Sequence, residues 1–132
     1  TWDYTRSRPL AHAVYDWESR KIGGNTPPIR TEHGWLTLHH GVAEDWQYRL
    51  GALLLDHDDP TRVIARSRTP LLVPELEWEL KGCYSMGGVI FPCGKLVLGD
   101  ELFVYYGAAD KHIGLATCKL ADLLAELLRN RV

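Results

Sequence analysis

The sequence contains no long hydrophobic run. No apolar stretch approaches the roughly 20 residues that a membrane-spanning helix needs, and no signal-peptide pattern opens the chain. We therefore expect a cytoplasmic protein without a membrane partner. The first residue is Thr1 rather than methionine, which predicts that an upstream part was removed or left out.

An excess of charge of either sign is also missing. The chain has 15 basic and 17 acidic residues and a formal net charge of −2. A nucleic-acid-binding surface needs basic side chains gathered on one face, so we expect no nucleic-acid partner. With 132 residues, of which 45% are hydrophobic and 24% charged, the composition is typical of one globular domain.

Cysteine is scarce, with only Cys83, Cys93 and Cys118. The count is odd, and the spacings match neither a zinc ribbon nor a CxxC redox motif. We interpret the three as buried thiols of a reducing cytosol, and we predict neither a disulfide nor a metal site.

Strand signals dominate what is present. Alternating or continuous apolar segments with Gly, Pro or Asp at their ends predict strands at 34–42, 48–56, 62–67, 89–98, 101–109 and 112–120. Hairpin turns are expected at 99–100 and 108–111, and loops at 19–33 and 74–88. Only 120–132 is predicted helical, because its leucines recur on one face.

This pattern indicates an all-β protein of short antiparallel strands with a short C-terminal helix. A propeller blade of four strands takes about 40–50 residues, so the chain holds two to three blades of a partial β-propeller. That is too few to close a ring, and it leaves open sheet edges. We therefore expect either a homo-oligomer or one part of a longer chain.

Five segments, in this order, resemble a known family: "WESRKIGGNTPPI", "EHGWLTLHHGV", "YRLGALLLDHDDPTRVIARS", "VIFPCGKLVLGDELFVYYGAAD" and "IGLATCKLADLLAEL". Together they cover nearly everything from Trp17 to the C-terminus. The set is similar to glycoside hydrolase family 130, the inverting β-mannoside phosphorylases, which are five-bladed β-propellers. The resemblance is to the C-terminal portion of that fold, which implies that residues 1–132 form one domain of C-terminal blades and that the N-terminal blades are absent.

The resemblance implies a reaction. In that family, orthophosphate attacks the anomeric carbon of a β-mannoside and releases the sugar as its α-1-phosphate with inversion. It implies a β-mannoside oligosaccharide and inorganic phosphate as substrates, and no cofactor. It also implies that the catalytic acid, an aspartate in an earlier blade, is missing here, so that this chain carries no catalytic residue and is inactive alone.

Four site residues follow from the motifs. Lys21, His40 and Tyr48 resemble residues at the family's phosphate, and Asp110 resembles a carboxylate that binds hydroxyls of the sugar. From the residues alone, Lys21 also fits a solvated loop lysine beside a Gly-Gly turn, and Asp110 fits a hairpin-turn aspartate. Arg49, next to Tyr48, is a further candidate.

The adjacent His39 and His40 raise the question of a metal site, which the strand geometry argues against. Neighbours on a strand point to opposite faces, so they cannot converge on one ion without a bulge. The family more often has Tyr at the position of His39. Two alternative functions remain: a non-catalytic propeller module that binds carbohydrate or anions, and a family hydrolase that uses water in place of phosphate.

Overall fold

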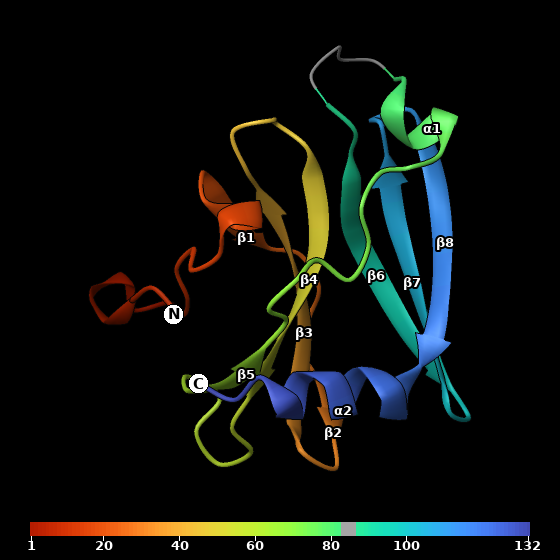
Figure 1. Cartoon of the computed structure of the whole chain (residues 1–132). Helices are drawn as coiled ribbons and strands as arrows, with labels where there is room; N and C mark the ends of the chain where they lie inside the picture. Colours follow the sequence, from red (N-terminus) through yellow and green to blue (C-terminus); the bar gives the residue numbers. More distant parts are fainter. Residues whose placement is uncertain (83–86) are drawn as a thin grey trace.

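Two antiparallel sheets stand side by side, and one helix crosses the same end of both (Figure 1). The structure, a computed structural model, describes residues 1–82 and 87–132. The strands are β1 (Lys21–Gly24), β2 (Ile29–Thr31), β3 (Gly34–Val42), β4 (Tyr48–Leu55), β5 (Val63–Arg66), β6 (Ile90–Leu98), β7 (Glu101–Ala108) and β8 (His112–Lys119). The helices are α1 (Glu77–Leu80) and α2 (Leu120–Arg129), and two 3₁₀ turns, η1 (Tyr4–Arg6) and η2 (Asp16–Glu18), precede the first strand.

The first sheet, called sheet A, has the order β1-β3-β4-β5, with β2 also paired to β3. Strand β3 is long enough to hold both short strands on one edge: β1 pairs with residues 39–42, and β2 pairs with residues 34–36. On its other edge, β3 pairs with β4 along its whole length. This arrangement places the β1–β2 connection beside the middle of β3.

The second sheet, called sheet B, is the meander β6-β7-β8. Gly99 takes a left-handed φ of 61° in the tight β6–β7 turn, where a glycine relieves the strain. Ala109 and Asp110 are left-handed in the β7–β8 turn, with φ of 50° and 54°. Val89 joins the sheets at this end, because Tyr48 N–H donates to Gly88 O at 3.0 Å and Ala109 N–H donates to Val89 O at 3.2 Å.

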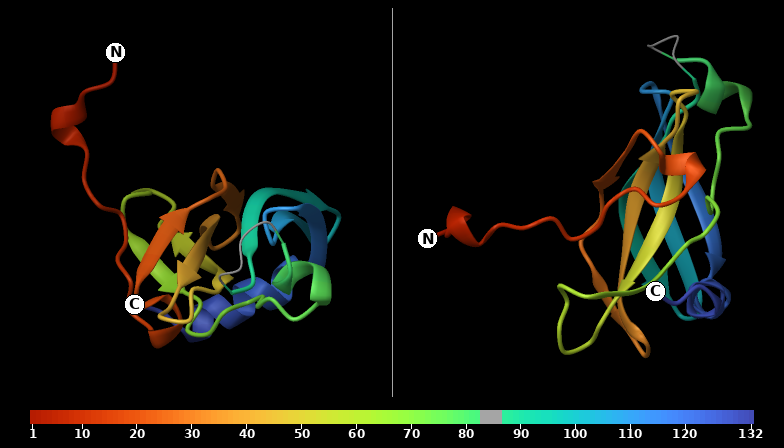
Figure 2. Two further views of the ribbon diagram at one scale, coloured as in Figure 1. Left: turned by 90° about the horizontal axis from the view of Figure 1, so that it is seen from above. Right: turned by 60° about the vertical axis from the view of Figure 1, so that its left-hand side comes forward.

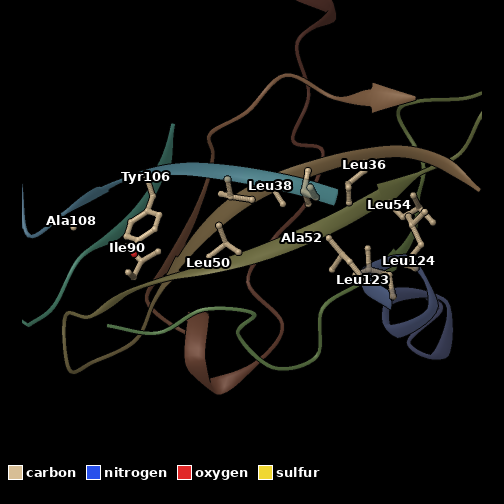
Figure 3. Close-up of a cluster of buried hydrophobic side chains, with 14 residues drawn as sticks. Leu36, Leu38, Leu50, Ala52, Leu54, Ile90, Tyr106, Ala108, Leu123 and Leu124 are labelled. Atoms are coloured by element: carbon tan, nitrogen blue, oxygen red, sulfur yellow. The ribbon is translucent and has the colours of Figure 1, made fainter. Parts of the chain in front are cut away.

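The core lies between the facing surfaces of the sheets and is closed by α2 (Figure 3). Its buried side chains are Leu36, Leu38, Leu50, Ala52, Leu54 and Ala65 from sheet A, Ile90, Leu102, Val104, Tyr106 and Ala108 from sheet B, and Leu123, Leu124 and Leu127 from α2. Burying one leucine contributes about 1.5–3 kcal/mol. This apolar set therefore holds the two sheets face to face.

The first residues extend away from the sheets (Figure 2), but η2 is tied to sheet A. Glu18 is fully buried, and its carboxylate pairs with Arg66 of β5 and with His39 of β3. Trp17 lies against the backbone of Gly41 in β3, where any side chain would collide with the indole. The segment before β1 is thus part of the folded unit from η2 onward.

Helix α1 is attached to sheet B through Glu79. Tyr106 O–H donates to Glu79 Oε1 at 2.6 Å, while the backbone N–H groups of Glu75 and Leu76 donate to Oε2. Burial and this hydrogen bond raise the pKa of Tyr106 well above its usual range. Trp78 stacks on the same Tyr106 ring with centroids 6.2 Å apart.

The predicted strands and the predicted terminal helix are confirmed, so the chain is mostly β with two antiparallel sheets and a short C-terminal helix. Two predicted loops were wrong in part. Residues 21–24 and 29–31 form β1 and β2, because β3 offers them an edge that local sequence does not reveal, and residues 77–80 form α1.

The predicted burial of the cysteines is also wrong where it is tested. Cys93 and Cys118 are exposed free thiols, because Cys93 lies at the bulge of the edge strand β6 and Cys118 lies on the edge strand β8. Cys83 lies outside the described residues.

Candidate functional site

Lys21, His40 and Tyr48 lie on one face of sheet A, the face that also carries the core. Residues directly opposite each other in antiparallel strands share a face. Lys21 pairs with Val42, which pairs with Tyr48, and His40 lies two residues from Val42 along β3. Val42, which is fully buried, lies between Lys21 and Tyr48 on this face.

The three side chains form one cluster. Lys21 Nζ donates to the Tyr48 hydroxyl at 2.7 Å, and it lies 4.7 Å from the centroid of the Tyr48 ring. The His40 ring lies 5.3 Å from the Tyr48 ring and 4.9 Å from the ring of Phe91 in sheet B. The cluster therefore joins β1, β3 and β4 with the first strand of sheet B.

Lys21 keeps N–H donors that none of the described residues uses. An ammonium has three N–H groups, and one is given to Tyr48. In the parts of the chain that the structure describes, none of the ion pairs involves Lys21. Its side chain is exposed, so its charge is available to an anion from solvent.

His40 is buried, with 8% of its surface exposed, and it is uncharged near neutral pH. Burial and the nearby charges of Lys21 and His39 lower the pKa of His40 to about 4. Its Nδ1 lies 2.8 Å from Asn25 Oδ1. A Cβ added at Gly23 would lie 2.9 Å from His40 Nε2 and closer still to Cε1, so only glycine leaves room for this ring.

His39 points to the opposite face, as the strand alternation predicts. Its Nε2 lies 3.2 Å from Glu18 Oε2, and its ring lies 5.7 Å from the ring of Trp17. Burial alone would raise the pKa of Glu18, but the hydrogen bonds from His39 and Val14 and the charge of Arg66 hold it below its usual range. His39 thus belongs to a structural network with Glu18, whereas His40 belongs to the cluster.

Asp110 lies in the β7–β8 turn and its side chain is exposed. Its neighbour Ala109 bonds to Val89, and Val89 forms a bridge with Tyr48, so the turn is at the same end of the molecule as Tyr48. No hydrogen bond or ion pair of the Asp110 carboxylate is formed with residues 1–82 or 87–132.

Arg49 does not belong to the cluster. It alternates with Tyr48 onto the other face of β4, and its guanidinium is paired with Asp45, with Nη1 3.0 Å from Oδ1. Its charge is already neutralised there.

Sequence reasoning missed two members of the site. Gly23 was expected only in a Gly-Gly turn beside Lys21, but it lies in β1 and makes room for His40. Asn25 was not singled out, because its partner is fifteen positions away and no local pattern marks the pair.

Lys95 is a half-buried cation near the cluster. Its Nζ donates to Thr26 Oγ1 at 2.6 Å and to the carbonyl oxygen of Pro27, which ties β6 to the β1–β2 connection. Burial lowers the pKa of Lys95 to about 8. Both partners are neutral, so Lys95 joins the sheets without an opposing charge.

Other features of the described chain do not compete with this cluster. A cavity of about 240 Å³ between the sheets and α2 is lined almost entirely by apolar side chains and contains none of the four predicted site residues. Within residues 1–82 and 87–132, no three His, Cys, Asp or Glu side chains gather as metal ligands. None of the described helices has the length and apolar character to cross a bilayer.

The cluster can bind an oxyanion. An ammonium and a phenol supply charged and neutral donors, and an uncharged imidazole supplies one donor and one acceptor. His40 and Tyr48 lie on β3 and β4, which are paired with each other along their lengths.

Comparison with known proteins assigns the chain. A family model described as β-1,4-mannooligosaccharide phosphorylase matches residues 1–129. The chain is 52% identical over 108 residues to a β-1,2-mannobiose phosphorylase and 46% identical over 107 residues to a 1,2-β-oligomannan phosphorylase, both from Thermoanaerobacter sp. (strain X514). These matches cover 82% and 81% of this chain but only 34% and 36% of the two relatives.

A solved structure agrees with this. The β-1,2-mannobiose phosphorylase of Listeria innocua, in complex with β-1,2-mannobiose, has a TM-score of 0.80 and 42% identity, over 85% of this chain and 31% of that one. The chain thus spans about a third of the length of the relatives it matches. The match over nearly its whole length shows that the chain belongs to glycoside hydrolase family 130, the family of the β-mannoside phosphorylases.

Proposed function

We propose that this chain supplies part of the phosphate and sugar site of a β-mannoside phosphorylase. The observation that carries the proposal is the cluster of Lys21, His40 and Tyr48 on one face of sheet A. Inorganic phosphate is the co-substrate, and no further cofactor takes part. The relatives at 52% and 46% identity are named as phosphorylases, which supports this reaction over hydrolysis by water.

The cluster is suited to phosphate in particular. Lys21 contributes a charge that no carboxylate of the described chain neutralises, and Tyr48 contributes a hydroxyl held in place by that lysine. A nucleophilic phosphate must be bound without losing its negative charge, and donors of this kind bind it without giving up a proton to it. One oxygen of the bound phosphate then attacks the anomeric carbon of the β-mannoside while the glycosidic bond breaks. The leaving oxygen takes a proton from the general acid of another blade, and the product is α-mannose 1-phosphate.

Asp110 is our candidate for the sugar side of the site. It projects from a turn at the same end as Tyr48, and its carboxylate accepts hydrogen bonds from sugar hydroxyls. The left-handed backbone of this turn fixes where the side chain leaves the chain.

We further propose that sheets A and B are C-terminal blades of a five-bladed propeller, and that other blades carry the general acid and the rest of the phosphate site. The chain's span of about a third of its relatives supports this arrangement. Blades from a longer chain or from a second copy then cover the open faces. A cytoplasmic location fits the free thiols of Cys93 and Cys118.

Calorimetric titration with inorganic phosphate tests the site. We expect Lys21→Ala to weaken binding by about tenfold or more, since a hydrogen bond to a charged group is worth about 1.5–3 kcal/mol. Lys81→Ala is the matched control, because Lys81 is an exposed lysine paired with Glu77 at 3.0 Å. Equal phosphate affinity of wild type and Lys21→Ala contradicts the proposed role of Lys21.

A second measurement tests the proposal that this chain lacks the general acid. The 132-residue chain is expected to release no mannose 1-phosphate from a β-mannoside in the presence of phosphate. Release of that product by the chain alone contradicts the proposal that the general acid lies elsewhere.

A further inference from the structure

The side-chain amide of Asn25 faces the ring of His40. Its side-chain Oδ1 lies 2.8 Å from His40 Nδ1, and an amide oxygen only accepts hydrogen bonds. Nδ1 must therefore be the protonated nitrogen. The backbone around Asn25 is fixed, because the N–H groups of Asn25 and Thr26 both donate to Leu38 O and Leu38 N–H donates to Thr26 Oγ1.

The other ring nitrogen of His40 is consequently an acceptor. A neutral imidazole has one N–H, so Nε2 carries a lone pair. Nε2 has no hydrogen-bond partner among the described residues. The ring packs between Gly23, Tyr48 and Phe91.

We propose that Asn25 is a positioning residue that makes the site select a protonated oxyanion, monohydrogen phosphate, and reject sulfate. This rests on the phosphate site proposed above. Lys21 and Tyr48 donate hydrogen bonds and therefore accept either oxyanion. His40 Nε2 accepts a hydrogen bond from the P–OH group of phosphate, whereas sulfate has no proton to offer and places an oxygen lone pair against the lone pair of Nε2.

The same arrangement bears on the reaction. Holding the phosphate proton at His40 leaves the remaining phosphate oxygens unprotonated. One of these unprotonated oxygens is the one that attacks. The site thus selects the ion that donates a hydrogen bond to His40 and still has an unprotonated oxygen for the attack.

Asn25 offers a clean test because its amide serves nothing else in the described structure. Its Nδ2 is buried and has no hydrogen-bond partner there. Asn25→Leu keeps a side chain of similar size and removes the acceptor. Without it, we expect the proton of His40 to move to Nε2, which then donates to either oxyanion.

The experiment compares the affinities of phosphate and sulfate for the 132-residue chain, at a mildly alkaline pH where both are dianions. Long-range hydrogen–nitrogen NMR correlations of His40 report which ring nitrogen is protonated. In the wild type we expect a protonated Nδ1 and a preference for phosphate of about tenfold or more. In Asn25→Leu we expect a protonated Nε2 and a preference close to one, while Asn130→Leu, a matched change at the end of α2, behaves as wild type.

The outcomes separate the two proposals. Phosphate and sulfate binding equally well to the wild type overturns the selectivity and leaves the phosphate site standing. An unchanged preference in Asn25→Leu, or a protonated Nε2 in the wild type, overturns the role of Asn25. Absence of phosphate binding overturns the site itself and the selectivity with it, and the NMR reading then still tests the hydrogen bond between Asn25 and His40.

Discussion

Replacing the buried Glu18 by glutamine should destabilise the fold strongly. Glu18 is fully buried, and its carboxylate meets the Arg66 guanidinium, the His39 ring and the backbone N–H of Val14. Glu18→Gln keeps the shape and removes the charge, which leaves Arg66, itself only 4% exposed, without its counter-ion. Breaking a buried ion pair in this way costs about 3–5 kcal/mol.

That loss is large beside the whole stability of a domain, which is about 5–15 kcal/mol. Urea unfolding followed by tryptophan fluorescence measures it, since the chain has five tryptophans and Trp17 stacks beside this network. The matched control is Glu126→Gln, which breaks an exposed pair with Arg129 and should cost less than about 1 kcal/mol.

A double variant isolates the ion pair. In Glu18→Gln with Arg66→Met, no buried charge is left alone, so the cost should fall short of the sum of the single variants by about 1 kcal/mol or more. A Glu18→Gln protein within about 1 kcal/mol of the wild type refutes the claim that this buried carboxylate holds η2 to sheet A.

Three further predictions concern the cluster and its surroundings. Gly23→Ala should displace the His40 ring and lower the free energy of unfolding by about 1–3 kcal/mol. In Gly24→Ala the added Cβ meets open space, so the loss should be less than about 1 kcal/mol. Equal losses for the two variants in urea unfolding contradict the close contact between Gly23 and His40. Because the pKa of His40 is lowered to about 4, the unfolded chain binds this proton before the folded protein does as pH falls. The free energy of unfolding should therefore drop by about 2 kcal/mol between pH 6.5 and 4. This part of the pH dependence should vanish in His40→Gln. Because the pKa of Lys95 is lowered to about 8, the folded protein loses that proton before the unfolded chain does as pH rises. The stability of the wild type should therefore rise relative to that of Lys95→Met between pH 8 and 10.5. Parallel curves of stability against pH for the two proteins exclude the burial of a charged Lys95.

Local sequence was sufficient for most of the fold. Strands β3, β4, β6, β7 and β8 begin and end within one residue of the predicted segments, because alternation and turn residues are properties of neighbouring positions. Strand β1 was missed because its sequence, two residues followed by Gly-Gly, carries no strand signal, and it forms only where β3 offers an edge. The short helix α1 was missed for a similar reason, since Glu79 is held by Tyr106, 27 positions away.

The site shows the same division. Lys21, His40 and Tyr48 were predicted from motifs, and the register of β1, β3 and β4 brings them together. What sequence did not reveal is the support around them: the hydrogen bond between His40 and Asn25 and the space left by Gly23. Such contacts depend on the packing of strands against one another, and that packing also leaves Cys93 and Cys118 exposed where burial was predicted.

Residue-resolved NMR of the chain during titration with inorganic phosphate tests the central claim most directly. The cluster predicts that the largest and saturable shifts fall on Lys21, His40 and Tyr48, and that they disappear in Lys21→Ala and persist in Lys81→Ala. Shifts that fall elsewhere on the chain, or that survive unchanged in Lys21→Ala, contradict a phosphate site on this face of sheet A.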